Sequence, residues 1–513
     1  MKNGHLMKRV KRALAVPLLA IGLWAGVAAA AQPERKLNVL AVCAHPDDVE
    51  YSVGGTLLKY RNQGHNIYIV LTTSGNTGSN VMTNRALIGE TREREMLKAA
   101  QAYGAKVWFL RNDDERLLDT NETRTQVLDA MRWANPDVIF THSKDDPSPD
   151  HRMTSQLVRA MVLSLPGVNQ QATEKPCDKK VSVFMWDCDF AVGARNPEFY
   201  VDISDVFEGK FAALQNHESQ KSYMDVFGTL LGEDMKCYNA FRGLQYGCKY
   251  AECFVGFKIH GYMPDFRLLP GDVPKGDGPL HVLAIGAHPD DIEQHVGGTL
   301  LKYREKGAKI YFALTTSGNT GSTERKDPAE IGRIREAEQL ASAKFYGAEV
   351  RFLRADDERL LDTNEMRTKV LDAMRWANPD VIFTQSPTDE SPDHWMTAKL
   401  VEAMVLSLPG INQQSGERPC TKKVSVFTWE NDACVGSPQP TAYVDISDVM
   451  DLKLESFRSH VSQVGYMGTF NIAIEDDVKV PDRFRGLQVG CKYAECFNGF
   501  YIPGYMPDFK LLP

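Results

Sequence analysis

The sequence predicts an α/β protein of two tandem Rossmann-like domains, each with a mostly parallel sheet flanked by helices. The 513-residue chain carries the same motifs twice: His45 recurs as His288 and His151 as His394, both at an offset of 243 positions. A repeat of this length is the size of a whole domain, so each copy can bury a core of its own. Within each copy, strand-like and helix-like patterns alternate, which is typical of parallel strands joined by crossover helices.

The elements of the first copy can be predicted in order along the chain. Residues 37–44 form a continuous apolar run, as expected for a strand buried on both faces. Residues 48–64 follow with helical spacing and a terminal glycine. The second copy repeats the same order from residue 280. Further strands are predicted at 66–73, 106–111 and 137–142, and further helices at 90–103, 123–133 and 150–165.

Composition divides the chain into four segments. Residues 1–31 combine a basic start, a short apolar run and an alanine-rich end, which is typical of a secretory signal peptide. A membrane anchor is the alternative, although the apolar run barely reaches spanning length. We therefore expect a secreted or periplasmic protein with no stable membrane span after cleavage. The first domain is predicted at 32–269, a Pro/Gly/Asp-rich linker at 270–279 and the second domain at 280–513.

Charge and cysteine content limit the partners. The net charge is −8 and no basic block follows the first dozen residues, so we do not expect nucleic acid as a partner. The ten cysteines show no zinc-finger spacing, which favours structural roles. An oxidising compartment would permit disulfides among them.

A histidine and two aspartates follow the first strand, and a second histidine follows the fourth. Ligands of such sheets bind beyond the carboxyl ends of the strands, where these residues meet. A catalytic zinc takes three nitrogen or oxygen ligands from the protein and keeps one position open. We predict His45, Asp48 and His151 as zinc ligands and Asp47 as a free carboxylate that acts as a general base. In the second copy the predicted ligands are His288, Asp291 and His394, with Asp290 as the base.

Three other interpretations of this pattern stay open. The acidic pair could simply favour a helix start through the helix dipole. Two histidines and one carboxylate also describe the facial triad of non-heme iron enzymes. A zinc-containing carbohydrate-binding protein without activity in one or both domains would carry the same residues.

Nearly all of both halves resembles the PIG-L/LmbE-like family of zinc-dependent deacetylases. The motifs that carry the resemblance are AHPDD after the first strand, GGT in the next helix, PDH after the fourth strand and a late H-x-SQ. The resemblance implies removal of N-acetyl groups from N-acetylglucosamine-type sugars or glycoconjugates. It also implies one Zn²⁺ per domain, with the ligands and bases named above.

One departure concerns the residue that would stabilise the oxyanion. Many family members have His-Pro-Asp-His where this chain has Ser148 and Ser391, and we expect both serines to cap helices. His217 and His460 are then candidate oxyanion donors, with a surface histidine beside a helix end as the alternative. His142 is a weaker candidate, because its counterpart is Gln385.

Several further positions have a plain structural interpretation as well as a functional one. Arg92 and Glu95 could form a surface ion pair or contact substrate. The loop at 113–116 (DDER) could be solvated, and Trp186 is expected in the core rather than as a sugar platform. The copies also differ near the expected site, which could separate their specificities without changing the chemistry. Examples are Tyr51–Ser52 against Gln294–His295, Arg152 against Trp395 and Asp187 against Glu430.

Overall fold

A computed structural model describes residues 35–187, 197–225, 230–259, 263–270, 278–431, 437–468, 473–502 and 506–513. The predicted signal peptide and most of the predicted linker lie outside these residues, so both stay predictions. Among the helices of the described ranges, none has the length and apolarity needed to cross a membrane.

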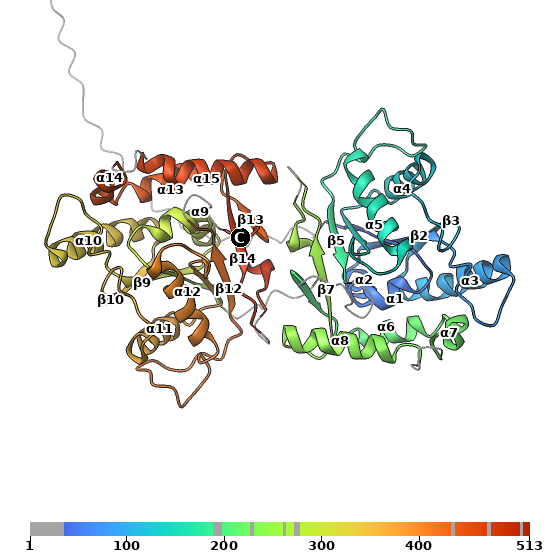
Figure 1. The fold of residues 1–513 in the computed structure, drawn as a ribbon, viewed down its shortest axis with the longest axis horizontal. Helices are drawn as coiled ribbons and strands as arrows, with labels where there is room; N and C mark the ends of the chain where they lie inside the picture. Colours follow the sequence, from blue (N-terminus) through green and yellow to red (C-terminus); the bar gives the residue numbers. More distant parts are fainter. Residues whose placement is uncertain are drawn as a thin grey trace, which may run out of the picture. The chain divides into compact units, whose positions relative to one another are not determined.

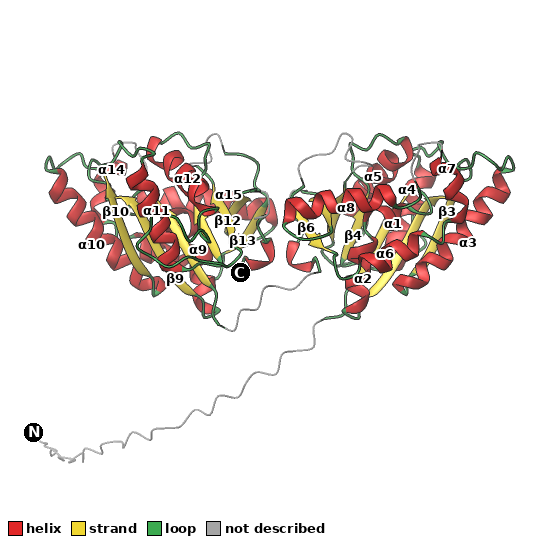
Figure 2. Ribbon diagram, turned by 90° about the horizontal axis from the view of Figure 1, so that it is seen from below, coloured by secondary structure: helices red, strands yellow, loops and turns green. Residues whose placement is uncertain are grey.

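Each copy forms one seven-stranded sheet with helices on both faces (Figures 1 and 2). The strands of the first copy are β1 (Asn38–Cys43), β2 (Asn66–Thr73), β3 (Lys106–Asn112), β4 (Val138–Thr141), β5 (Ser182–Trp186), β6 (Phe199–Asp202) and β7 (Ala251–Gly256). Its described helices are α1 (Asp48–Ser52), α2 (Gly54–Asn62), α3 (Arg85–Tyr103), α4 (Asn121–Ala134), α5 (Pro149–Met161), α6 (Phe207–Leu214), α7 (Lys221–Asp225) and α8 (Glu233–Tyr246).

The second copy repeats this arrangement. Its strands are β8 (His281–Gly286), β9 (Lys309–Thr316), β10 (Glu349–Ala355), β11 (Val381–Thr384), β12 (Ser425–Trp429), β13 (Ala442–Asp445) and β14 (Ala494–Gly499). Its described helices are α9 (Asp291–Glu305), α10 (Pro328–Tyr346), α11 (Asn364–Ala377), α12 (Pro392–Val405), α13 (Met450–Phe457), α14 (Val461–Gly468) and α15 (Ile474–Val489).

The strand order confirms the predicted fold class and extends it. The first sheet runs β3-β2-β1-β4-β5-β7-β6 and the second β10-β9-β8-β11-β12-β14-β13. The first five strands of each order pair in parallel, whereas β7 pairs antiparallel with β5 and β6. The mostly parallel sheet therefore ends in an antiparallel edge that the strand–helix alternation did not predict.

The first strand lies in the middle of its sheet and is covered on both faces, as its unbroken apolar run predicts. Val39 and Ala41 belong to a core that includes Leu57 of α2. Leu40 belongs to the core on the other face, together with Val127 of α4. Because β1 is anchored on both sides, the residues that follow it are held firmly at the sheet edge.

The predicted helix at 48–64 is two helices in the first copy, α1 and α2, which meet at Val53. The second copy keeps one continuous helix, α9. In both copies a pair of glycines allows a close approach. A Cβ added at Gly55 would lie 2.7 Å from Ile203 Cγ2, so this position requires glycine.

A buried lysine and glutamate lie beneath this glycine pair. In the first copy Glu252 accepts hydrogen bonds from the backbone N–H of Gly55 at 2.8 Å and from Lys210 Nζ at 2.6 Å. Lys210 also donates to Asn239 Oδ1 at 2.8 Å. The ion pair is fully buried, so each partner depends on the other for its charged form.

The second copy carries an additional charge at this place. Lys453 contacts Glu495 at 2.6 Å and Asp482, the counterpart of Asn239, at 2.7 Å. Burial raises the pKa of Asp482 to about 7, although Lys453 opposes the shift. The second copy therefore holds two acidic groups against one lysine where the first holds one.

No disulfide joins any two of the eight cysteines that the structure describes. The remaining two, Cys188 and Cys434, lie outside the described residues. The disulfides that an oxidising compartment would permit are therefore not formed among the eight described cysteines.

Candidate metal centre and active site

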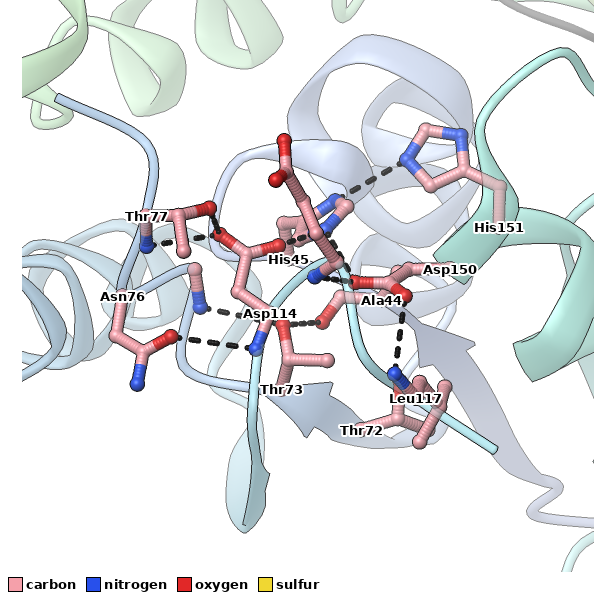
Figure 3. A network of polar contacts seen from close by, with 12 residues as sticks. Ala44, His45, Thr72, Thr73, Asn76, Thr77, Asp114, Leu117, Asp150 and His151 are labelled. Atoms are coloured by element: carbon pink, nitrogen blue, oxygen red, sulfur yellow. Dashed lines mark hydrogen bonds and ion pairs between the residues drawn. The ribbon is translucent and has the colours of Figure 1, made fainter. Parts of the chain in front are cut away.

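Three predicted ligands of the first copy converge at the carboxyl edge of its sheet. His45 follows β1, Asp48 opens α1, and His151 lies in the first turn of α5, which follows the neighbouring strand β4. His45 Nδ1 and His151 Nε2 are 3.2 Å apart, as the dashed line in Figure 3 marks. Asp48 lies 3.3 Å from His151 Nε2 through Oδ1 and 3.7 Å from His45 Nδ1 through Oδ2. The three side chains therefore face one point.

The second copy brings together the equivalent residues. His288 Nδ1 lies 3.1 Å from His394 Nε2, and Asp291 Oδ1 lies 3.7 Å and 3.5 Å from these two nitrogens. Tetrahedral zinc with Zn–N bonds of 2.0–2.1 Å holds its nitrogen ligands about 3.3 Å apart. The nitrogen separations in both copies match this edge length, so the residues present fit a zinc ion.

Buried carboxylates orient the two histidines. Asp114 Oδ1 lies 2.9 Å from His45 Nε2, and Asp146 Oδ1 lies 3.0 Å from His151 Nδ1, so each ring turns its other nitrogen to the shared point. Carboxylates commonly support metal-binding histidines in this way. The DDER loop is therefore not merely solvated, because Asp114 is only 4% exposed. The sequence singled out the loop that contains Asp114 but not its contact with His45, and it gave no sign of Asp146. The two aspartates recur as Asp357 and Asp389.

Asp48 is held by a relay that begins at a buried tryptophan. The indole N–H of Trp186 donates to His142 Nδ1 at 3.2 Å, and His142 Nε2 lies 3.1 Å from Asp48 Oδ2. Since an indole N–H can only donate, Nδ1 accepts and the proton of the neutral imidazole is on Nε2. The backbone N–H of Ala44 lies 3.0 Å from both Nε2 and Asp48 Oδ2, and with this tautomer it donates to the carboxylate. Burial lowers the pKa of His142 to about 4, in agreement with this neutral form.

The second copy builds the same relay with an amide. Trp429 donates through Nε1 to Gln385 Oε1, and Gln385 Nε2 donates to Asp291 Oδ2, each at 2.5 Å. His142 and Gln385 are therefore equivalent supports for a metal ligand, and the structure assigns His142 a positioning role rather than that of an oxyanion donor. Both tryptophans are buried in the core, as predicted.

The electrostatics of the centre favour a cation. Burial alone would lower the pKa of His45, but the surrounding carboxylates, first of all Asp48, hold it well above the ordinary value. Burial would also raise the pKa of Asp48, yet the three nearby imidazoles hold it well below its usual range. Such a concentration of acidic groups around two imidazoles suits a bound divalent ion.

Asp47, the predicted base, lines the same cavity as the ligands. Its φ of 109° lies in a region that residues other than glycine rarely adopt, and Asp290 repeats it with 117°. This backbone strain is typical of residues held in place for function. Arg92 Nη2 contacts Asp47 Oδ2 at 3.2 Å. Burial raises the pKa of the Asp47 carboxyl although Arg92 opposes the shift, which moves the pKa in the direction that suits a general base.

Arg92 and Glu95 are not a surface ion pair, because both are buried. Arg92 donates to the carbonyl oxygens of Pro46 at 2.7 Å and Gly75 at 3.1 Å. Glu95 instead accepts hydrogen bonds from the backbone and hydroxyl of Ser219. Arg92 thus links the loop at residues 72–79, which follows β2, to the turn that carries the predicted base Asp47.

Both candidate oxyanion donors are buried histidines that contact a glutamate. His217 is fully buried, contacts Glu50 Oε2 through Nε2 at 3.1 Å, and is not among the residues that line the cavity. His460 is equally buried and lies 3.5 Å from Glu293. The alternative of a surface histidine is therefore wrong for both. Burial would lower the pKa of His217, but the contact with Glu50 outweighs it and raises the pKa.

The serines precede α5 and α12 as predicted, but their hydroxyls do not cap these helices. Ser148 and Ser391 occupy the N-cap positions and a proline follows each, yet neither side chain makes a capping hydrogen bond. In the first copy the backbone N–H of Ser148 donates to Asp146 Oδ1 at 2.9 Å. The same oxygen contacts His151, so this turn serves the histidine.

A cavity of about 420 Å³ lies over the first centre. Its lining includes the three predicted ligands, Asp47 and Arg92, together with Tyr51 and Ser52 of α1 and Met235 and Tyr238 of α8. This volume falls within the 300–1,000 Å³ that is usual for small-molecule sites.

Comparison with known proteins places this site in a family. The description "PIG-L: GlcNAc-PI de-N-acetylase" matches residues 40–162 and 283–405. Diacetylchitobiose deacetylase of Thermococcus kodakarensis is 30% identical over 192 residues, which are 36% of this chain and 69% of that protein. The chain belongs to the PIG-L family. Each matched range contains one complete set of predicted ligands and base.

Other similar proteins include two with different names. A probable N-acetyl-alpha-D-glucosaminyl L-malate deacetylase 2 of Bacillus cereus is 29% identical over 195 residues, covering 36% of this PIG-L chain and 85% of its own length. A 4-oxalmesaconate hydratase of Pseudomonas putida is 24% identical over 206 residues, covering 37% and 76%. The solved N,N'-diacetylchitobiose deacetylase of Pyrococcus horikoshii is 28% identical, covers 44% of this chain and 84% of its own, and has a TM-score of 0.39.

Proposed function

We propose that this protein is a zinc-dependent hydrolase that removes N-acetyl groups from N-acetylglucosamine-type sugars or glycoconjugates. The observation that carries the proposal is the position of Asp47. This carboxylate is not one of the three residues arranged to hold a metal ion, but it lines the same cavity as they do. Membership of the PIG-L family and the deacetylase names of two relatives support the choice of substrate.

The chain's own residues would divide the work as follows. A zinc ion, when bound by His45, Asp48 and His151, supplies an acidified water and polarises the amide carbonyl. Asp47 would accept the proton at its carboxylate and return it to the leaving amine. Arg92 holds one oxygen of this carboxylate and so fixes its direction. The products would be acetate and a free amino sugar.

A second candidate is the addition of water to an unsaturated organic acid, which the hydratase among the relatives favours. The same base and metal ligands could serve that chemistry. A deacetylase releases acetate and a hydratase does not, so one assay separates them. Metal analysis of the active protein distinguishes zinc from the iron of a facial triad.

The test is acetate release from a panel of N-acetylated sugars by the zinc-loaded protein, alongside Asp47→Asn, Asp290→Asn and the double variant. We expect partial loss in each single variant and complete loss in the double. Glu122→Gln, which changes an exposed carboxylate of α4, is the matched control and should keep full activity. Zinc-loaded protein that releases no acetate from any sugar would overturn the proposal in favour of hydration or of sugar binding alone.

We also propose that the protein is exported, on the strength of the basic and apolar pattern in residues 1–31. N-terminal sequencing of the mature protein from an expressing cell should find a new terminus after Ala30 or Ala31. An intact Met1 on protein recovered from the cytoplasm would contradict export.

A further inference from the structure

Most residues that line the cavity of the first copy recur in the second, and a few are exchanged. Of the twenty-one residues that line the first cavity, sixteen have an identical counterpart 243 positions later, including every ligand, the base and the carboxylates around them. The five exchanged positions, here called the second wall, lie in α1, directly after β5 and in α8. They are Tyr51 to Gln294, Ser52 to His295, Asp187 to Glu430, Met235 to Val478 and Tyr238 to Pro481.

In the first copy this wall is aromatic and open. Tyr51 and Tyr238 are half-buried rings on the cavity, with Ser52 as a small neighbour. The Tyr238 hydroxyl donates to Asp187, which also pairs with Arg242, so the ring is held in place. A fixed aromatic face with a polar tip is well suited to pack against a sugar ring.

In the second copy the same wall lacks the two tyrosines and carries a histidine and a glutamine instead. The His295 ring lies parallel to Trp429, at 2° and 6.0 Å between centroids. Gln294 Nε2 donates to Asp477 Oδ2 at 2.8 Å, and Pro481 provides no aromatic face. Gln294, His295 and Pro481 line a small cavity of about 20 Å³, whose lining includes none of the predicted metal ligands of the second copy.

We propose that this second wall sets a different substrate size for each domain. The first domain takes an N-acetylated disaccharide or longer glycan, whose next ring packs on Tyr51 and Tyr238. The second domain takes an N-acetylated monosaccharide, because His295 occupies the space that Ser52 leaves open. This inference rests on the proposed deacetylase function and adds the substrate class of each site.

The test compares N-acetylglucosamine with its β-1,4-linked disaccharide in full-length, zinc-loaded protein. Asp290→Asn isolates the first site and Asp47→Asn the second. The ratio of kcat/KM for the disaccharide over the monosaccharide should be at least tenfold higher in the first. Ser52→His should lower the ratio of the first site about tenfold, by raising KM for the disaccharide more than KM for the monosaccharide.

The reciprocal change, His295→Ser, should raise the ratio at the second site, and His295→Asn, which shortens the side chain but keeps it polar, should do so in part. Tyr238→Phe keeps the ring but removes its hydrogen bond to Asp187, so it should lower the ratio of the first site less than Tyr238→Ala does. Equal ratios at the two sites, or ratios that no exchange moves, would overturn the inference.

Calorimetric binding of the deacetylated sugars, glucosamine and its disaccharide, separates this inference from the proposed function. Disaccharide binding that Ser52→His weakens would sustain the size difference even if no acetate were released, and only the deacetylase proposal would fail. Equal affinity of both sites for the disaccharide would overturn the inference while leaving the reaction intact. Neither release nor binding of any of these sugars would overturn both.

Discussion

Replacing His142 with alanine should weaken zinc binding at the first centre about 10–100-fold, the usual effect of losing a partner of a metal ligand. This corresponds to about 1.4–2.7 kcal/mol of binding free energy. Asp48 Oδ2 would keep its hydrogen bonds from the backbone N–H groups of Ala44 and His45, at 3.0 and 2.6 Å, so the ligand should loosen rather than leave. The indole N–H of Trp186 would lose its partner while buried, which costs about 1–3 kcal/mol of stability.

His142→Gln is the matched variant, because Gln385 makes both bonds of the relay in the second copy. It should bind zinc within about threefold of the unchanged protein. Competition with a chromophoric chelator, in a chain whose second centre is disabled by His288→Ala, measures the affinity of the first centre alone. If glutamine cost as much as alanine, or if alanine cost nothing, the relay would not support the ligand and the reasoning would fail.

Three further results are expected. Burial raises the pKa of Asp482 in the native protein to about 7, above the ordinary 3.8. The native state therefore holds a proton that the unfolded chain loses between about pH 4 and pH 7. The free energy of unfolding should fall over this range, by up to about 4 kcal/mol. Asp482→Asn, which installs the residue found at Asn239, should flatten this dependence in urea unfolding at pH 5 and pH 7.5; an unchanged slope would contradict the assignment. Gly55→Ala should cost about 1–3 kcal/mol of stability by overpacking against Ile203. Combined with Ile203→Ala, which removes Cγ2, it should cost less than the sum of the two single changes; thermal unfolding that shows no loss for Gly55→Ala would refute the close contact. Chelation should abolish acetate release and lower the unfolding temperature, and added Zn²⁺ should restore both; full activity after chelation would exclude a metal role.

The sequence predicts the convergence of His45, Asp48 and His151 because they follow parallel strands, and the carboxyl ends of parallel strands meet at one edge. The repeat strengthens this prediction, since the pattern returns with the same spacing. The predicted metal ligands can therefore be identified from the sequence without knowing which residues are buried.

The supporting roles of Asp114 and Asp146 depend on their burial, which the sequence does not reveal. Asp114 and Asp146 belong to acidic loops whose composition is the same whether they are solvated or buried. Only the fold shows that both are nearly inaccessible and contact histidines. Their recurrence as Asp357 and Asp389 is the one signal that could have singled them out.

The fold was predictable up to the fourth strand and less so beyond it. The short strands β6 and β7 pair antiparallel, and β7 lies between β5 and β6, out of sequence order. Four to six residues carry too little periodicity to reveal such pairing, which tertiary packing decides. The break between α1 and α2 at Val53 likewise has no counterpart in α9, although the glycines are the same.

The duplication also gives each experiment on this protein its own reference. The predicted metal ligands, the predicted base and the carboxylates around them are identical in the two copies. A substitution in one copy can therefore be compared with the unchanged copy in the same sample. Temperature, metal supply, purity and protein concentration are then shared by test and control. Natural differences between the copies also suggest substitutions. Gln385, for example, occupies the position of His142, so His142→Gln introduces a residue that the second copy already carries at this place.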